Sequence, residues 1–139
     1  MEKTVILIKP DGMKRGLIGK VIDRFEQAGF KIIAAKLIKM DDELLKTWYA
    51  HLVDKPFFGE LCQFMKETPV LVMLWQGERI VGKAREICGA TDPKQAAPGT
   101  IRKEFGGELP KNVIHVSDSA EAAKKEEELI FKKEEIFEY

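Results

Sequence analysis

The chain has 139 residues, 45% of them hydrophobic, and its 23 basic and 23 acidic side chains cancel to a formal net charge of zero at pH 7. This composition excludes a disordered chain, and the lack of a basic excess argues against nucleic acid as a partner. The length suits one domain with a substantial core, so we expect a single domain over residues 1–139.

Cysteine and histidine usage narrows the chemistry further. Cys62 and Cys88 each lie in an apolar pattern of helical period, which favours buried free thiols over a disulfide or a metal pair. His51 and His115 are the only histidines, so no zinc-binding spacing exists. The first apolar run begins too early for a signal peptide, and no run approaches membrane-spanning length. We therefore expect a soluble, cytoplasmic protein without membrane contact.

In chain order, four short apolar runs predict β-strands. They cover residues 4–8, 31–38, 70–75 and 113–116.

Segments with apolar residues at helical spacing separate these runs. The first extends from Ile18 to Ala28 and ends at Gly29, a residue typical of the position just beyond a helix. Asp41 or Asp42 can cap the next helix. The later helices carry Leu44, Leu45, Trp48 and Leu52; Phe57, Leu61, Cys62 and Met65; Ile80, Val81, Ala84, Ile87 and Cys88; and Ala122, Ala123, Glu126 and Ile130.

Strand–helix–strand units near the start and around residue 75 predict an α+β sandwich. In this interpretation helices lie on one face of a four-stranded sheet. A small doubly wound parallel sheet remains the alternative on pattern alone.

The segment from residue 89 to 112 is rich in glycine and proline and contains several basic residues. Long irregular segments inside compact domains usually carry function. The apolar residues Ile101 and Phe105 indicate that the segment folds back onto the body, so we expect an ordered ligand-binding loop.

One phosphate-loop pattern is misleading. Residues 77–83 fit G-x-x-x-x-G-K, but Ala84 stands where magnesium coordination needs Ser or Thr. Ile80 and Val81 also continue an apolar pattern of helical period. In a helix the backbone amides bind carbonyls of the same helix and cannot bind a phosphate. We therefore reject this segment as a nucleotide site.

Three groups of residues can carry chemistry. Lys9 follows the first strand and offers a compact charge to a phosphate, although a solubilising strand end would look the same. Arg85 and Arg102 suit phosphate oxygens because their planar groups donate paired hydrogen bonds. His115 stands where a strand meets a helix start, and Glu126, on the last helix, can fix its tautomer and leave one ring nitrogen free as a nucleophile.

With these groups in place, the chain resembles a nucleoside diphosphate kinase along its whole length. The matching blocks occur in the family's order and at its spacing. They are residues 8–12 (IKPDG), 15–19 (RGLIG), 24–26 (RFE), 56–58 (PFF), 89–93 (GATDP), 98–102 (PGTIR), 112–115 (NVIH) and 117–119 (SDS).

The resemblance implies a ferredoxin-like α+β sandwich, a four-stranded antiparallel sheet with helices on its faces. It implies ping-pong transfer of the terminal phosphoryl group between nucleotides, with a phosphohistidine at His115 and little base selectivity. Glu126 matches the acid that orients the ring, and Ser117 its hydrogen-bonding neighbour. Lys9 would hold the transferring phosphoryl and the ribose hydroxyl, with Tyr49 bonded nearby.

The same resemblance implies the other nucleotide contacts. Arg85, Thr91 and Arg102 would bind the phosphates that are not transferred. Asn112 would contact the ribose. Phe57 would stack on the base, with Leu61 and Leu109 beside it. Mg²⁺ would arrive with the nucleotide, and Asp118 would touch it through water. The partners implied are nucleoside di- and triphosphates and further copies of the chain, with a hexamer favoured over a tetramer.

One departure from the family pattern concerns the residue after the nucleophile, which is Val116 instead of the usual glycine. Glycine tolerates backbone angles that a β-branched residue resists, so the backbone here is either ordinary or accommodated by its neighbours. We expect an active site, slower at most. Two alternatives to the enzyme are a nucleic-acid-binding or regulatory module and an effector-sensing domain.

Overall fold

Four antiparallel strands form one sheet in the computed structural model, which describes residues 1–139. Their order across the sheet is β2-β3-β1-β4. The strands are β1 (Glu2–Ile8), β2 (Lys31–Ile38), β3 (Val70–Gly77) and β4 (Ile114–Val116). All pairs are antiparallel, which confirms the α+β sandwich and excludes the doubly wound parallel sheet.

Seven helices connect and follow the strands. They are α1 (Pro10–Lys14), α2 (Ile18–Gln27), α3 (Asp42–Trp48), α4 (Phe58–Met65), α5 (Ile80–Cys88), α6 (Ile101–Phe105) and α7 (Ala120–Ile130). Short 3₁₀ turns cover Ala50–Leu52, Pro93–Gln95 and Lys133–Glu135. None of the helices combines the length and the apolar character needed to cross a bilayer.

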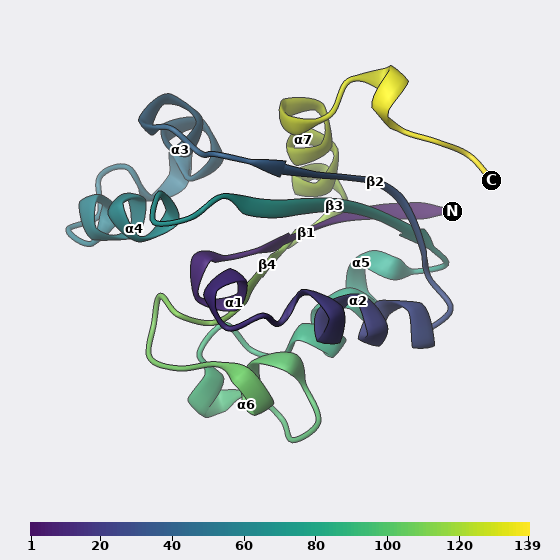
Figure 1. Cartoon of the computed structure of the whole chain (residues 1–139), viewed down its shortest axis with the longest axis horizontal. Helices are drawn as coiled ribbons and strands as arrows, with labels where there is room; N and C mark the ends of the chain where they lie inside the picture. Colours follow the sequence, from purple (N-terminus) through teal and green to yellow (C-terminus); the bar gives the residue numbers. More distant parts are fainter.

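The helices cover both faces of the sheet (Figure 1). Val5 and Leu7 of β1 belong to the core beneath α3, α4 and α7. Ile6 and Ile8 belong to the core on the opposite face, with α2 and α5. The interpretation that helices lie on one face is therefore wrong. The reason is visible in β1, where these four consecutive side chains are all fully buried, as in a strand covered by helices on both faces.

Two helices were not predicted from the sequence. Both α1 and α6 have five residues, which is less than two turns and too short to show a helical period. Local chemistry starts them: Pro10 occupies the first turn of α1, and the Thr100 hydroxyl accepts the Lys103 amide at the start of α6. Ile101 is fully buried and Phe105 packs beside it, so the segment from 89 to 112 folds back as expected.

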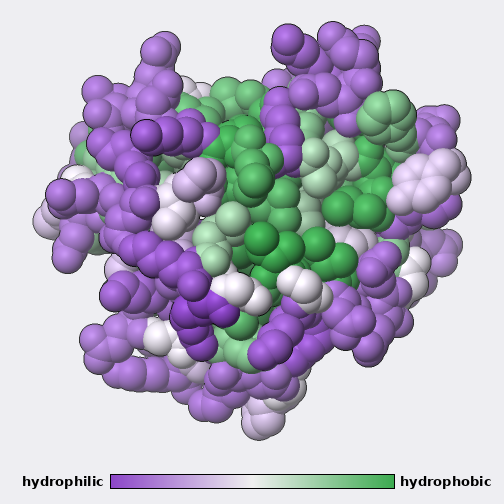
Figure 2. Space-filling model, viewed as in Figure 1, coloured by the Kyte–Doolittle hydropathy of each residue, from purple (hydrophilic) through white to green (hydrophobic).

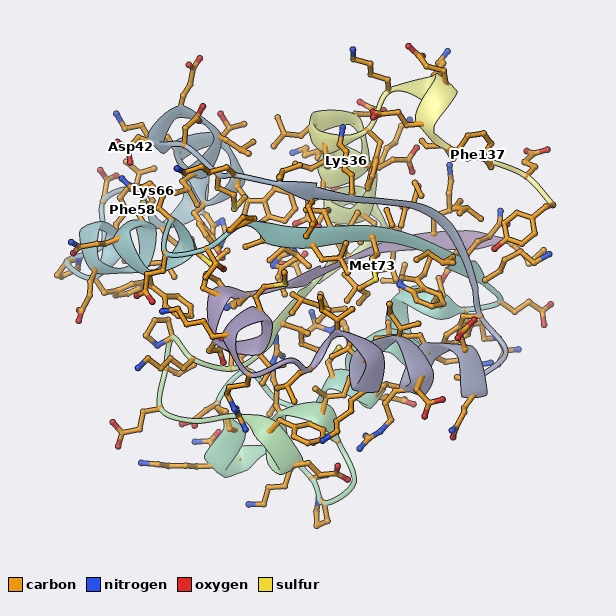
Figure 3. The ribbon with its side chains drawn as sticks, in the orientation of Figure 1. Lys36, Asp42, Phe58, Lys66, Met73 and Phe137 are labelled. Carbon is orange, nitrogen blue, oxygen red and sulfur yellow. The ribbon has the colours of Figure 1, made fainter.

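The C-terminal segment after α7 returns to the sheet at β2 (Figures 1 and 3). The Phe137 amide donates to the Ile33 carbonyl (3.0 Å) where β2 carries a bulge, and Lys36 pairs with Glu135 (3.0 Å). A bulge leaves one residue without a partner across the strands, and this segment supplies one.

Candidate active site

His115 lies in the middle of β4, and strand alternation decides the face that its side chain joins. Ile114 and Val116 belong to the core on the α2–α5 face, so His115 between them faces the layer of α3 and α7. There the imidazole borders a cleft of about 1650 Å³, which Lys9 and Arg102 also line. The ring is therefore within a pocket that contains cations, not sealed in hydrocarbon.

A chain of hydrogen bonds fixes one nitrogen of the imidazole. Nε2 of His115 lies 2.9 Å from Oε2 of Glu126 on α7, and the Ser117 hydroxyl donates to the other carboxylate oxygen (2.7 Å). The Val5 amide of β1 donates in turn to the Ser117 oxygen (3.0 Å). An ionised carboxylate only accepts, so this contact places the ring proton on Nε2 and leaves Nδ1 with its lone pair.

Two aromatic residues at the end of α3 border the same cleft. Trp48 lies against His115 with 5.0 Å between ring centroids and 61° between planes. Tyr49 is 7% exposed, and its hydroxyl has no hydrogen-bond partner in the chain, so the bond expected near Lys9 is absent. Burial, followed by the charge of Glu126, raises the pKa of Tyr49, which keeps the hydroxyl a neutral donor.

Lys9 links the end of β1 to the histidine strand. Its ammonium donates to Oδ1 of Asn112 (2.8 Å), and the side-chain amide of Asn112 donates to the Thr91 carbonyl (2.8 Å). Burial, assisted by the nearby charge of Arg102, lowers the pKa of Lys9 to about 8. An anion beside this ammonium would reverse that destabilisation of the charged form.

Arg102 projects from α6 into the interior and binds three backbone carbonyls. Its guanidinium donates to Gly89 (2.9 Å), Ile114 (2.7 Å) and Asn112 (3.4 Å). Burial lowers the pKa of Arg102, but a guanidinium stays charged in proteins. Three of its five N–H groups are used, so two remain for a ligand.

The remaining sequence-predicted contacts line the outer part of the cleft. Arg85 on α5 and Thr91 beyond it are both exposed to solvent. Phe57 and Leu109 at the mouth are 49% and 53% exposed, and Leu61 is buried beside them. The structure therefore brings the predicted site residues to one cleft, except Ser117, which is buried behind it and contacts Glu126.

Metal ligands are sparse here. No group of three or more His, Cys, Asp or Glu side chains converges anywhere in the chain, and Asp118 contributes one exposed carboxylate to the cleft. Such a site fits a divalent cation held mainly by a ligand's own phosphates, as Mg²⁺ often is.

The backbone around His115 resolves the question posed by Val116. Val116 pairs with Ile6 as ordinary extended strand, and its side chain points to the face opposite His115. The unusual residue is Val113, with φ of 74°, a region that a β-branched residue rarely adopts. Its amide donates to the Asp11 carboxylate (3.0 Å) and its carbonyl accepts the Lys9 amide (2.8 Å), which hold it there.

Sequence reasoning missed two residues of this site. Asp11 supports the histidine strand, and Trp48 contacts the imidazole itself. Trp48 was assigned only to an apolar helix face. Its neighbour Tyr49, already a candidate, is the one signal in the chain that could have drawn attention to it.

Comparison with known proteins gives a consistent answer. The family model described as nucleoside diphosphate kinase matches residues 2–136. A nucleoside diphosphate kinase of Bacillus cereus is 48% identical over 139 residues, which cover 100% of this chain and 94% of the relative. One from Saccharomyces cerevisiae is 49% identical over 138 residues, covering 99% and 90%.

Solved structures agree. A nucleoside diphosphate kinase of Halobacterium salinarum in complex with CDP superposes with a TM-score of 0.96 at 41% identity, covering 99% of this chain and 92% of that one. The Aquifex aeolicus nucleoside diphosphate kinase gives a TM-score of 0.94 at 42% identity, covering 98% and 99%.

Proposed function

The chain belongs to the nucleoside diphosphate kinase family, and from this premise we propose that it moves the terminal phosphoryl group of a nucleoside triphosphate to a nucleoside diphosphate through a phosphohistidine at His115. Residues 1–139 act as one domain in this proposal. The observation that carries it is the Glu126 contact at Nε2 of His115, which leaves Nδ1 as the free nucleophile beside Lys9 and Arg102.

In the first half-reaction the Nδ1 lone pair attacks the terminal phosphorus, and the bond to the bridging oxygen breaks. The nucleoside diphosphate leaves with that electron pair. Nε2 keeps its proton, and the Glu126 carboxylate at 2.9 Å balances the positive charge that develops on the ring. In the second half-reaction a terminal oxygen of another diphosphate attacks the phosphohistidine, and Nδ1 regains its lone pair.

Phosphoryl transfer depends on in-line positioning and on positive charge around the moving group. Lys9 would contact the moving phosphoryl and the ribose, with the Tyr49 hydroxyl as a further donor. Arg85, Thr91 and the two free N–H groups of Arg102 would bind the phosphates that stay. Mg²⁺ would come with the nucleotide and neutralise charge on its phosphates, and Asp118 would help to hold it through water.

Little base selectivity follows from the mouth of the cleft. Phe57 offers an aromatic face, Leu61 and Leu109 offer aliphatic contacts, and every base has a face to stack. Asn112 and Lys9 would bind the ribose, which is common to all ribonucleotides. No polar side chain in this set distinguishes one base from another.

We further propose a homo-oligomer, with a hexamer favoured over a tetramer. β2 is an edge strand, and its Leu37 is 62% exposed. Figure 2 shows hydrophobic residues gathered across the middle of the face where Figure 1 draws β2. An exposed apolar patch beside an open strand edge is typical of a surface that binds a partner.

Labelling tests the proposed chemistry directly. Incubation with γ-labelled ATP and Mg²⁺ should give an acid-labile, base-stable phosphoprotein that passes its label to GDP. His115→Gln should abolish labelling, whereas His51→Gln, which changes the other histidine, should retain it. Label that persists in His115→Gln would refute the assignment, and no label in the natural protein would favour a regulatory or effector-sensing module.

A further inference from the structure

We propose that Trp48 is a positioning residue, which holds the imidazole of His115 in the orientation needed for attack and whose fluorescence reports the state of that ring. This inference rests on the proposed phosphohistidine function. Its basis is the contact between the two rings, with centroids 5.0 Å apart and planes inclined at 61°. Such edge-to-face contacts between aromatic rings are favourable and directional.

The hydrogen bond to Glu126 does not by itself fix the reactive nitrogen. Rotation of a histidine ring about its Cβ–Cγ bond is soft. Nε2 lies closer to the axis of that bond than Nδ1, so a rotation that Nε2 and Glu126 can follow displaces Nδ1 further. A second contact on the ring is needed to hold Nδ1, and Trp48 supplies it.

The indole of Trp48 is held in one position by the packing of the core around it. It is 7% exposed and packs in the cluster formed by α3, α4 and α7. Its helix, α3, is capped by Asp41, whose carboxylate accepts a hydrogen bond from the Leu44 amide (2.8 Å). The indole N–H has no partner in the chain, so packing alone sets the position of the ring. Phenylalanine can therefore keep the aromatic contact with His115, while an aliphatic residue cannot.

The chain supplies its own matched control. Trp75 is the only other tryptophan; it is fully buried on the opposite face of the sheet and lies against Phe25 (5.5 Å between centroids). Replacing it removes a similar volume from a core without touching His115. Stability loss and loss of positioning can thus be separated.

The kinetic test compares Trp48→Leu, Trp48→Phe and Trp75→Leu with the natural protein. Since misplacement of a reacting atom by about 1 Å can cost ~100-fold, Trp48→Leu should lower kcat ~10- to 100-fold with little change in KM. Trp48→Phe should restore most of kcat. Trp75→Leu should lower the melting temperature comparably and leave kcat within about threefold, because it alters only a distant core. Equal losses of kcat in the two leucine variants, or full kcat in Trp48→Leu, would overturn the proposal.

Fluorescence gives a test that does not depend on a damaged enzyme. In Trp75→Phe all tryptophan emission comes from Trp48, and it should change when ATP with Mg²⁺ phosphorylates His115 and recover when ADP removes the phosphoryl group. ADP alone corrects for binding without transfer. Trp48→Phe, which keeps only Trp75, should show no such change.

The two proposals can fail separately. If the natural protein forms no phosphohistidine, the function has failed and the role of Trp48 in it fails too. If it exchanges phosphoryl groups while Trp48 emission is unchanged by phosphorylation, only the role of Trp48 is wrong.

Discussion

Lys9 and Arg102 are both buried cations, yet they differ in how many hydrogen-bond partners the chain gives them. Arg102 is satisfied by three backbone carbonyls and remains charged. Lys9 has one neutral partner, the Asn112 amide oxygen, and its pKa falls to about 8 through burial and the neighbouring Arg102. A buried ammonium with so little compensation is prepared for an anionic ligand.

The rate should therefore decline at alkaline pH through Lys9. Because its pKa in the folded, empty enzyme is lowered to about 8, the ammonium loses its proton as pH rises through that value, and kcat/KM should fall above it. The kcat profile should fall at higher pH, since bound phosphates favour the charged form. In Lys9→Arg the fall of kcat/KM near this pH should be absent, because a guanidinium keeps its proton there. If kcat/KM of Lys9→Arg fell at the same pH, the titrating group would be another residue.

Val116→Gly tests whether the departure from the family pattern impairs the site. The valine side chain is 8% exposed and lies on the face away from His115. Turnover should therefore change by less than about threefold, while unfolding should become easier by about 2–4 kcal/mol through the cavity and the flexible glycine. Steady-state kinetics and thermal unfolding check both parts, with Val116→Ala as an intermediate. A large gain in turnover would show that valine had disabled the natural enzyme.

At the scale of elements, long periodic segments could be predicted from the sequence and the two shortest helices could not. The β2 bounds at 31–38 and the α2 start at Ile18 match the pattern, because each has a full period of apolar residues. The helices α1 and α6 lack that length and depend on single capping contacts. The contact of Trp48 with His115 joins elements distant in sequence, and Arg102 binds carbonyls 10 to 13 residues away, so no local pattern encodes either.

The short helix α6 matters because it carries Arg102. The Thr100 hydroxyl accepts the Lys103 amide (3.2 Å) and donates to the Ala97 carbonyl (2.7 Å). Gly89, whose carbonyl accepts from Arg102, has φ of 89°, and a Cβ there would lie 2.5 Å from the Thr100 oxygen. The side of the cleft that Arg102 lines is thus built from closely fitted parts of one segment.

Thr100→Val should loosen this segment and weaken nucleotide binding. The valine preserves shape but removes both hydroxyl hydrogen bonds, at a cost of about 1–2 kcal/mol in stability. KM for the diphosphate should rise several-fold as Arg102 becomes less well held. Asp41→Ala removes a comparable cap from α3 and should leave KM unchanged. Equal effects on KM in the two variants would mean that general destabilisation, not Arg102, is responsible.

For the whole molecule, the open edge of the sheet is the feature that remains to be covered. Both faces carry helices, and the C-terminal segment lies along β2 from Ile32 to Lys36, which it contacts through Tyr139, Phe137 and Glu135. Beyond Lys36 the outer edge of β2 is open and carries the exposed side chain of Leu37. An open strand edge can pair with another strand, and in a folded protein it is usually covered by a specific partner.

Leu37→Lys tests whether that partner is a second copy of the chain. A lysine on an edge strand opposes strand pairing and adds like charge across a symmetric contact, so association should weaken. Light scattering should show the natural protein at several times the chain mass of 15.8 kDa and the variant shifted toward that mass. Val53→Lys, which changes a residue 41% exposed in the turn before α4, controls for loss of surface apolarity. An unchanged mass in Leu37→Lys would place the interface elsewhere, and a natural protein at 15.8 kDa would exclude the oligomer altogether.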